Sequence, residues 1–499
     1  MKSVACAVAA VALVVAGAAS AQSDAGVQKA PARDYASLLR QDATAFRAAI
    51  LDSHPGPLDT ENPGFDALLD RSYRLAMSRA KAGIGYREYY WAMVEFGNAF
   101  DDGHLGVAPI DQGYAHPWAF TWPGFVVALR DGAWRVVQRE GEARPAPGAR
   151  LIGCDGKGVE QFAAERLGPL TGRWRLTATR VRTAPRLFLR SDNPWRAPAK
   201  RCTFESAGKR MGYRLNWTPI DSTRRSTLIA ETVGTRFGTG IGLRKQADGG
   251  FWIRMGTFES DPQSEDGAQL TALVREIESR HAELASAPRL VFDLRGNSGG
   301  SSEWMARTAR ALWGKPWYDA KTWSASETDY RVSDGNIANF SDFAKKLDPA
   351  DSPELHRLVK LMIAGMEGAK AKGQAFWRFA DPENPSGVRP ALPAGADPVR
   401  ARIFVLTDFG CASACLDAVD VLTDLGATQV GQETDADTLY MEVRGFELPG
   451  GVMRAWLPTK VYRGRTRGSN VPAVPKYRWN GALADTDGIE AWIATLPAS

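Results

Sequence analysis

A serine in a turn of small residues is the first candidate for chemistry. Ser413 stands in the segment 411–415 (CASAC), which follows the apolar run 403–406 after four residues that end in Gly410. Apolar residues then recur at helical spacing up to Leu425, which predicts a strand, a tight turn and a helix. Unpaired N–H groups and the positive end of the helix dipole gather at such a helix start. Ser413 is therefore a candidate nucleophile toward a carbonyl group, the alternative being a small residue that only begins a helix.

A histidine and a pair of glycines are the next candidates. His104 ends the segment 101–104 (DDGH), which follows a helical stretch and precedes an apolar strand. A loop histidine after a glycine suits a general base, although a lone histidine is more often structural. Gly299 and Gly300 follow a predicted strand. They could form a simple turn into the next helix, or they could allow the backbone to approach a ligand closely. The segment is not a phosphate loop, because the GK[ST] ending is absent.

The elements around these residues alternate between strand and helix. Strands are predicted at 251–258 and 288–295, with a long amphipathic helix at 266–284 between them. This spacing predicts an α/β core at 226–499, with a mixed sheet and covering helices. Within the core, residues 315–398 combine tryptophans, a charged helix and a proline-rich end, which predicts an inserted lid or wall.

Two further modules precede the core. Residues 22–113 show helical periodicity and predict an N-terminal helical module. Residues 114–225 are β-rich, with a hairpin predicted at 131–132. The segment 145–156 resembles the PDZ pattern, in which a glycine turn feeds a strand ending at Asp-Gly; an ordinary hairpin is the alternative. PDZ-like modules bind extended peptide at a sheet edge.

Residues 1–21 have the composition of a secretory signal peptide, so we expect an exported protein, periplasmic or secreted. No later run is apolar enough to predict a membrane span. The net charge is +5, with 62 basic and 57 acidic residues interspersed, which does not indicate a nucleic-acid surface. The arginine-rich stretch 173–201 is the one local excess of positive charge, and we expect it to form a solvated face. The sequence does not indicate an oligomeric state.

Four cysteines remain after removal of the signal peptide, and an oxidising compartment favours disulfides in any of three pairings. A bridge between Cys154 and Cys202 would cross-link the β-rich module. Cys411 and Cys415, four residues apart, are within disulfide range on a helix, and two buried thiols are the alternative. No Cys/His set has zinc-site spacing, so we expect neither a metal nor another cofactor.

The segment 292–300 (FDLRGNSGG) resembles the D-L-R-x-N-x-G-G signature of the tail-specific, or C-terminal processing, serine peptidases. Residues 412–414 resemble their nucleophile turn, 430–434 their V-G-x-x-T strand, and 256–258 their first core strand. The resemblance covers most of the mature chain and implies a ClpP/crotonase-like core, a polypeptide substrate and Ser413 as nucleophile. It also implies an oxyanion hole formed by the N–H of Ala414 with that of Gly299 or Gly300.

The sequence departs from that family at the residue that would act as general base. Members with a Ser/Lys dyad carry a lysine where this chain has 435–437 (DAD), and no lysine occurs between Ser413 and Lys460. The D-G-H segment resembles the histidine-using branch, related to the tricorn core, which implies His104 as base. That branch usually orients the histidine with a glutamate in a segment that reads differently here, so Asn470 and Glu433 are the candidate orienters.

These observations predict an exported serine endopeptidase of tail-specific type, acting through an acyl-enzyme at Ser413. The alternative is a non-catalytic peptide- or ligand-binding protein that retains the peptidase fold. The missing lysine and glutamate favour the alternative, whereas the retained Ser413 and His104 oppose it.

Overall fold

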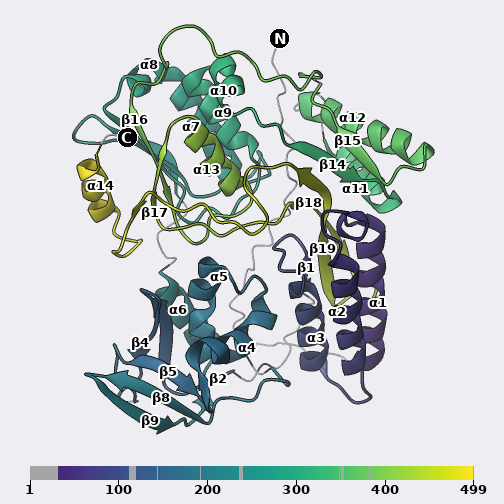
Figure 1. The fold of residues 1–499 in the computed structure, drawn as a ribbon, viewed down its shortest axis with the longest axis vertical. Helices are drawn as coiled ribbons and strands as arrows, with labels where there is room; N and C mark the ends of the chain where they lie inside the picture. The colour runs from purple at the N-terminus through teal and green to yellow at the C-terminus, as the bar shows by residue number, and fades with distance from the viewer. Residues whose placement is uncertain are drawn as a thin grey trace.

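The computed structural model describes residues 32–111, 118, 120–142, 144–191, 193–234, 240–347, 349, 353–382 and 384–497. The predicted signal peptide, 1–21, lies outside these ranges. None of the helices within them is long and apolar enough to cross a bilayer. Figure 1 shows an upper α/β core with two lower lobes, one helical and one rich in strands.

The core is a six-stranded sheet in the order β11-β12-β13-β16-β17-β20, and all neighbours are parallel except the antiparallel pair β11 and β12. The central strands are buried along nearly their whole length, as expected for a sheet covered on both faces. Helices α7, α9 and α13 pack on one face, and α14 packs on the other. The predicted mixed α/β core is confirmed. The elements of this core are β11 (Ile241–Lys245), β12 (Phe251–Met255), α7 (Glu265–Ser279), α8 (His281–Ala285), β13 (Arg289–Asp293), α9 (Glu303–Trp313), α10 (Lys315–Lys321), β16 (Arg402–Thr407), α13 (Ala414–Asp424), β17 (Thr428–Gly431), β20 (Tyr477–Arg478) and α14 (Thr486–Thr495).

A second, antiparallel sheet lies beside the core and has the order β1-β19-β14-β15, with β18 paired to β19. Its strands are β1 (Gly106–Pro109), β14 (Glu327–Arg331), β15 (Phe376–Phe379), β18 (Tyr440–Glu447) and β19 (Met453–Arg463). The segment 315–398 supplies β14 and β15, together with α11 (Asp334–Lys346) and α12 (Pro353–Ala371). These helices bury their own apolar cluster, which includes Tyr330 and Met366, so the inserted segment is a packed part of the second sheet.

The N-terminal helices are α1 (Tyr35–Ser53), α2 (Phe65–Arg79) and α3 (Tyr86–Asn98), with a short 3-10 turn η1 (Gly56–Leu58) after α1. Their apolar cluster includes Met453 and Leu457 of β19, and β1 pairs with the same strand, Gly106 opposite Trp456. The N-terminal lobe therefore shares a core with a C-terminal hairpin. This packing brings the loop between α3 and β1 to the edge of the core (Figure 1).

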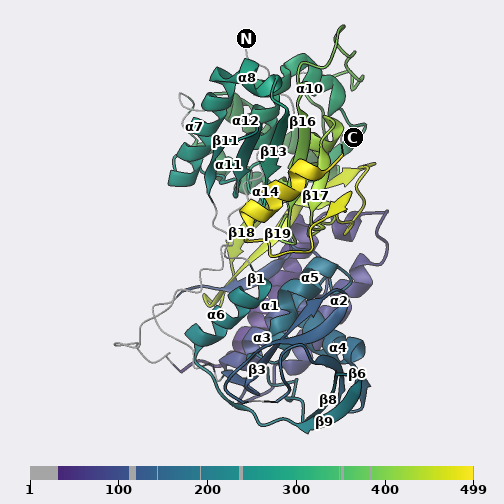
Figure 2. The ribbon, with the colours of Figure 1, turned by 90° about the vertical axis from the view of Figure 1, so that its left-hand side faces the viewer.

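The β-rich module contains a sheet in the order β3-β4-β5-β8-β9, with β6 on β5, and a small sheet β10-β2-β7. The predicted hairpin at 131–132 joins β3 to β4. The predicted boundary at 225 falls inside α6, whose Leu228 packs with Trp122 and Val126, so the module extends to the end of that helix. The elements are β2 (Phe120–Trp122), β3 (Phe125–Arg130), β4 (Ala133–Arg139), β5 (Arg150–Cys154), β6 (Lys157–Gly158), α4 (Val159–Thr171), α5 (Thr177–Thr183), η2 (Ala184–Leu187), β7 (Arg190–Ser191), β8 (Arg201–Ser206), β9 (Lys209–Arg214), β10 (Thr218–Pro219) and α6 (Ser222–Val233). Figure 2 shows this module beneath the core.

Candidate active site

Ser413 occupies the turn between β16 and α13, as the sequence predicts, and is the residue immediately before the helix. Its φ of 55° and ψ of −127° are values that residues other than glycine rarely adopt. The Asp408 carboxylate accepts the N–H of Gly410 at 2.9 Å and that of Gly296 at 3.0 Å. These hydrogen bonds stabilise the turn and connect it to the glycine-rich segment 296–300.

A disulfide joins Cys411 to Cys415 and spans Ser413, and both of its cysteines are fully buried. A second disulfide joins Cys154 to Cys202 across β5 and β8. Both bridges are among the pairings that the four cysteines allow. The first encloses the nucleophile turn, and the second lies within the β-rich module.

The glycine pair lies against the nucleophile turn. A Cβ added to Gly299 would lie 2.7 Å from the Cβ of Ser413, and one added to Gly300 would lie 1.7 Å from the Phe258 carbonyl oxygen. Only glycine fits either position, because both also have positive φ. The N–H of Gly299 donates to Oδ1 of Asn297 at 2.9 Å. The N–H groups of Gly300 and Ala414 have no recorded acceptor in the described part of the chain, so these two remain available to a substrate oxygen.

His104 lies in the loop between α3 and β1, beside the carboxylate of Asp102, which the sequence alone does not mark as part of a site. Oδ1 of Asp102 accepts the backbone N–H of His104 at 2.7 Å and lies 3.7 Å from its Nδ1. Burial raises the pKa of the Asp102 carboxyl, while His104 opposes that shift. The acidic pair before Gly103 was the available signal for this residue. Asp102 is therefore the structure's candidate for orienting the ring.

One loop, 433–438, connects the serine turn to the histidine loop. Oδ2 of Asp437 accepts the backbone N–H of Ser413 at 2.6 Å. The hydroxyl of the next residue, Thr438, donates to Oδ2 of Asp102 at 2.9 Å. Consecutive residues thus contact the elements that carry Ser413 and His104, so the fold brings these two distant parts of the sequence to one place.

The same loop is held by arginines of the β-rich module. Asp435 is 1% exposed and forms ion pairs with Arg173 at 3.1 Å and Arg182 at 2.9 Å. Arg173 also donates to the carbonyl of Ala436 at 2.7 Å. The prediction of a solvated face at 173–201 is wrong for Arg173, whose side chain is mostly buried, because its acidic partner comes from a distant loop.

The two predicted orienters have other partners. Glu433 lies 3.7 Å from Arg478, and the Asn470 side chain donates to the Asp101 carbonyl at 2.9 Å. Among the contacts of the described residues, neither joins His104. The backbone N–H of Asn470 donates to the carbonyl of Asp437 at 2.7 Å, so this residue ties two loops together.

Lys460, the nearest lysine after Ser413 in the sequence, is buried beside Glu442, with Nζ 3.2 Å from Oε2. Burial alone would lower the pKa of its ammonium, but Tyr330, Tyr462 and Glu442 together raise the pKa well above its usual value. A protonated lysine held in an ion pair cannot act as a general base at neutral pH.

Comparison with known families identifies the class of protein. Residues 252–464 match the model of peptidase family S41. This range includes Ser413, both glycines and the loop 433–438, whereas His104 lies before it. This part of the chain thus resembles the peptidase domain of family S41, and the protein is a serine-type peptidase.

The chain resembles several solved structures of peptidases, and no curated protein matches it in sequence. Mature CPAF complexed with lactacystin is 15% identical, with 92% of this chain and 98% of that chain covered and a TM-score of 0.55. The photosystem II D1 C-terminal processing protease is 12% identical, with coverages of 92% and 97% and a TM-score of 0.33. The tricorn protease is also 12% identical, with coverages of 92% and 37% and a TM-score of 0.39. The likeness to CPAF supports the fold of N-terminal helices with a mixed sheet core.

Proposed function

We propose that this peptidase is a tail-specific serine endopeptidase of the histidine-using branch, with Ser413 as nucleophile and His104 as general base. The observation that carries the proposal is the loop 433–438, which contacts Ser413 through Asp437 and the histidine loop through Thr438. The same loop has aspartates where the Ser/Lys branch has its lysine, and Lys460 is protonated in an ion pair.

In this proposal the Ser413 hydroxyl attacks the peptide carbonyl while His104 takes its proton. The N–H groups of Ala414 and Gly300 receive the oxyanion, and His104 then protonates the leaving amine. Water, deprotonated by His104, hydrolyses the ester and releases the second product. Asp102 acts as a positioning residue, whose negative charge favours the imidazolium and whose Oδ1 already holds the His104 backbone.

The core would then be ClpP/crotonase-like, and the β-rich module would be the PDZ-like module. Its order β3-β4-β5-β8-β9 leaves β3 and β9 as edges to which an extended peptide could add as a strand. Tail specificity predicts faster cleavage of a peptide with a free C-terminal carboxylate than of the same peptide amidated. Equal kcat/KM for the two would contradict it.

Export to the periplasm or the medium is part of the proposal and rests on residues 1–21 and the two disulfides. N-terminal sequencing of the protein recovered from each cell fraction tests it. We expect the exported protein to begin at Gln22. A chain found only in the cytoplasm, beginning at Met1, would contradict export.

The rival is a binding protein that retains the fold, and one observation favours it: Nδ1 of His104 has no hydrogen-bond partner among the described residues. A serine-reactive fluorophosphonate probe separates the two functions. We expect labelling of the wild type, none of Ser413→Ala, and strongly slowed labelling of His104→Gln, because a serine and its base act as a unit. Labelling of Ser413→Ala equal to the wild type would refute the assignment.

A further inference from the structure

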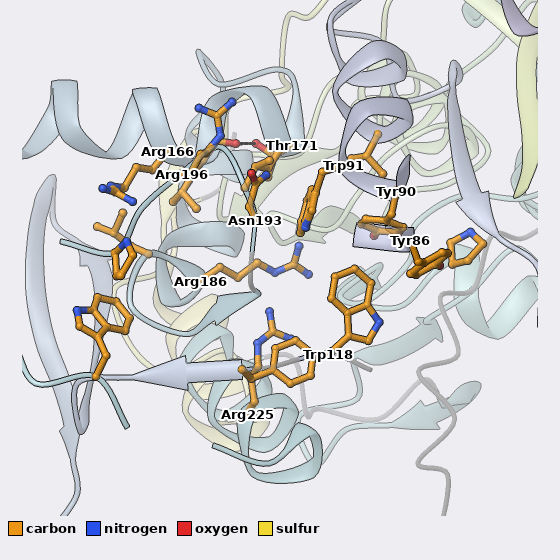
Figure 3. A pocket seen from close by; sticks show the side chains of 18 residues that line it. Tyr86, Tyr90, Trp91, Trp118, Arg166, Thr171, Arg186, Asn193, Arg196 and Arg225 are labelled. Atoms are coloured by element: carbon orange, nitrogen blue, oxygen red, sulfur yellow. Dashed lines mark hydrogen bonds between the residues drawn. The ribbon is translucent and has the colours of Figure 1, made fainter. Parts of the chain in front are cut away.

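A cavity of about 370 Å³ lies between α3 of the N-terminal lobe and the β-rich module, and the proposed chemistry does not use it. Its lining comes from α3, α4, η2, α6 and the segments around them, as Figure 3 shows. Neither Ser413 nor the edge strands β3 and β9 contribute to it. Six aromatic side chains form much of the wall: Tyr86, Tyr90, Trp91, Trp118, Phe120 and Trp217.

The polar part of the cavity is strongly basic. Four arginines line it, and no aspartate or glutamate is among the described lining residues. Arg196 has an acidic partner outside the cavity, Glu95, at 3.0 Å. Arg186 and Arg225 form no ion pair with any residue of the described ranges. No carboxylate of the described residues therefore neutralises their two positive charges.

Arg186 and Arg225 belong to one electrostatic site. Arg186 is exposed, and its side chain reaches into the cavity between Trp91 and Trp118 (Figure 3). Arg225 stacks 4.5 Å over the Phe120 ring and donates through Nε to the carbonyl of Leu189 at 3.2 Å. Burial, followed by the charge of Arg186, lowers the pKa of Arg225 to about 10. The remaining guanidinium N–H groups have no recorded acceptor among the described residues, so they are available to a ligand.

Arg225 is half-buried near the second cation, Arg186, and no acidic side chain is among the described lining residues, so an anion bound here would relieve an unfavourable arrangement. Guanidinium groups match carboxylate geometry with paired hydrogen bonds, and aromatic walls suit a flat apolar body. The volume falls within the range of small-molecule sites. We propose that this cavity binds a small organic acid, in which an aromatic ring packs against the aromatic wall and a carboxylate meets Arg186 and Arg225.

The position of the cavity predicts that the ligand affects catalysis. Its walls α3 and α4 meet at their C-terminal ends, where the Asn98 side chain donates to the Leu170 carbonyl at 2.7 Å. From there α3 continues to the loop of His104, and α4 continues to Arg173, which holds the loop 433–438. A ligand between these helices therefore affects both the loop that carries His104 and the loop 433–438 that contacts Ser413. This coupling rests on the proposed function, whereas binding of the acid does not.

Calorimetry on the full chain carrying Ser413→Ala tests binding without any need for activity. The probe is 3-phenylpropionate, with 3-phenylpropionamide as its neutral match and acetate as the anion without a ring. We expect binding of the first only, weakened about 10-fold or more by Arg186→Gln and by Arg225→Gln, since each removes a charged hydrogen bond. Arg210→Gln, at an exposed arginine of β9, is the matched control and should bind like the parent.

Equal affinity for the acid and the amide would overturn the proposal, as would acid binding that both arginine variants leave unchanged. A peptide ending in phenylalanine that binds more tightly than 3-phenylpropionate, with the same arginine dependence, would overturn the assignment to a small molecule. Should Arg186→Gln fail to fold, Arg186→Lys keeps the charge but loses the paired geometry and should still weaken binding. In the active wild type, saturating 3-phenylpropionate should change kcat at least two-fold, and no such change should occur in Arg225→Gln. An unchanged wild-type kcat would overturn the coupling alone.

Discussion

The backbone N–H of Ser413 donates to the carboxylate of Asp437 at 2.6 Å. This bond helps to hold the serine at its positive φ, and a buried acid occupies the segment where the Ser/Lys branch has a lysine. The carboxylate of Asp437 also raises the pKa of Asp102, after the larger effect of burial. One acidic loop therefore affects both the backbone of the nucleophile and the charge beside the proposed base.

Ser413→Gly should lose activity and gain stability. Glycine accepts a φ of 55° without strain, whereas serine at such a conformation costs about 1–3 kcal/mol. Part of that gain is offset by about 0.5–1 kcal/mol of added chain entropy in the unfolded state. We therefore expect a melting temperature a few degrees above wild type for Ser413→Gly and close to wild type for Ser413→Ala, by calorimetry. Both should lower kcat by about a thousand-fold or more. A glycine variant that melts below the alanine variant would show that the backbone at Ser413 is not strained.

Asp102→Asn should lower kcat by about 10²–10⁴-fold with little change in KM, because the neutral amide no longer favours the protonated ring of His104. The fold should survive, since Oδ1 of asparagine can still accept the His104 N–H and its amide can donate to Thr438. Steady-state kinetics checks this. Wild-type kcat in the variant would show that Asp102 does not orient the histidine.

The same substitution has a predicted effect on stability with pH. The pKa of Asp102 is raised in the folded state, mainly by burial, so the folded protein holds this proton more tightly than the unfolded chain. The ionised form of Asp102 therefore disfavours folding. The stability that protonated Asp102 contributes is fully present below its pKa in the unfolded chain, and it is lost as the pH rises through its pKa in the folded protein. Asp102→Asn does not titrate, so it should melt above wild type at pH 7, with the difference shrinking toward pH 4. A difference that grows on acidification would contradict this sign.

Arg173→Gln should lower both stability and turnover. It removes a charged hydrogen bond from Asp435, which is nearly inaccessible, at a cost of about 1.5–3 kcal/mol. Adding Asp435→Asn should recover part of the loss, because without Arg173 the buried carboxylate has only one ion-pair partner, Arg182, whose side chain is 44% exposed. Urea unfolding and kcat of the double-mutant cycle measure this. Arg210→Gln, which breaks an exposed pair with Glu205, is the control and should cost less than about 1 kcal/mol. If the losses from Arg173→Gln and Asp435→Asn simply add in the double mutant, the two residues are not coupled.

The two disulfides should differ in their effects. Replacing Cys411 and Cys415 by alanine opens a very short loop, worth about 2 kcal/mol of chain entropy, but releases the backbone around Ser413. Replacing Cys154 and Cys202 opens a loop with a sequence separation of 48, worth about 4 kcal/mol. We expect the first variant to lose more turnover and the second more stability, by kinetics and calorimetry. Alanine is preferred to serine because all four cysteines are buried. Equal turnover in both variants would show that the first bridge does not hold the nucleophile.

The sequence determined the local units of the core. The run 403–406, the small residues around Ser413 and the periodic apolar residues after it are a strand, a turn and a helix in the structure, because hydrophobic period and glycine or alanine content act within one segment. The glycine pair was also recognisable, since its requirement for bare backbone is local. The D-G-H segment marked His104 in the same way.

Tertiary structure decided which distant residues meet. Asp102 contacts Thr438, and Arg173 contacts Asp435, only because the N-terminal helices share a core with β19 while the β-rich module packs beside the loop 433–438. No periodicity within a segment encodes such pairings. The arginine-rich stretch therefore looked like a solvated face, and the partners of Glu433 and Asn470 were not foreseeable. Charge and burial at a site depend on contacts that chain order alone does not contain.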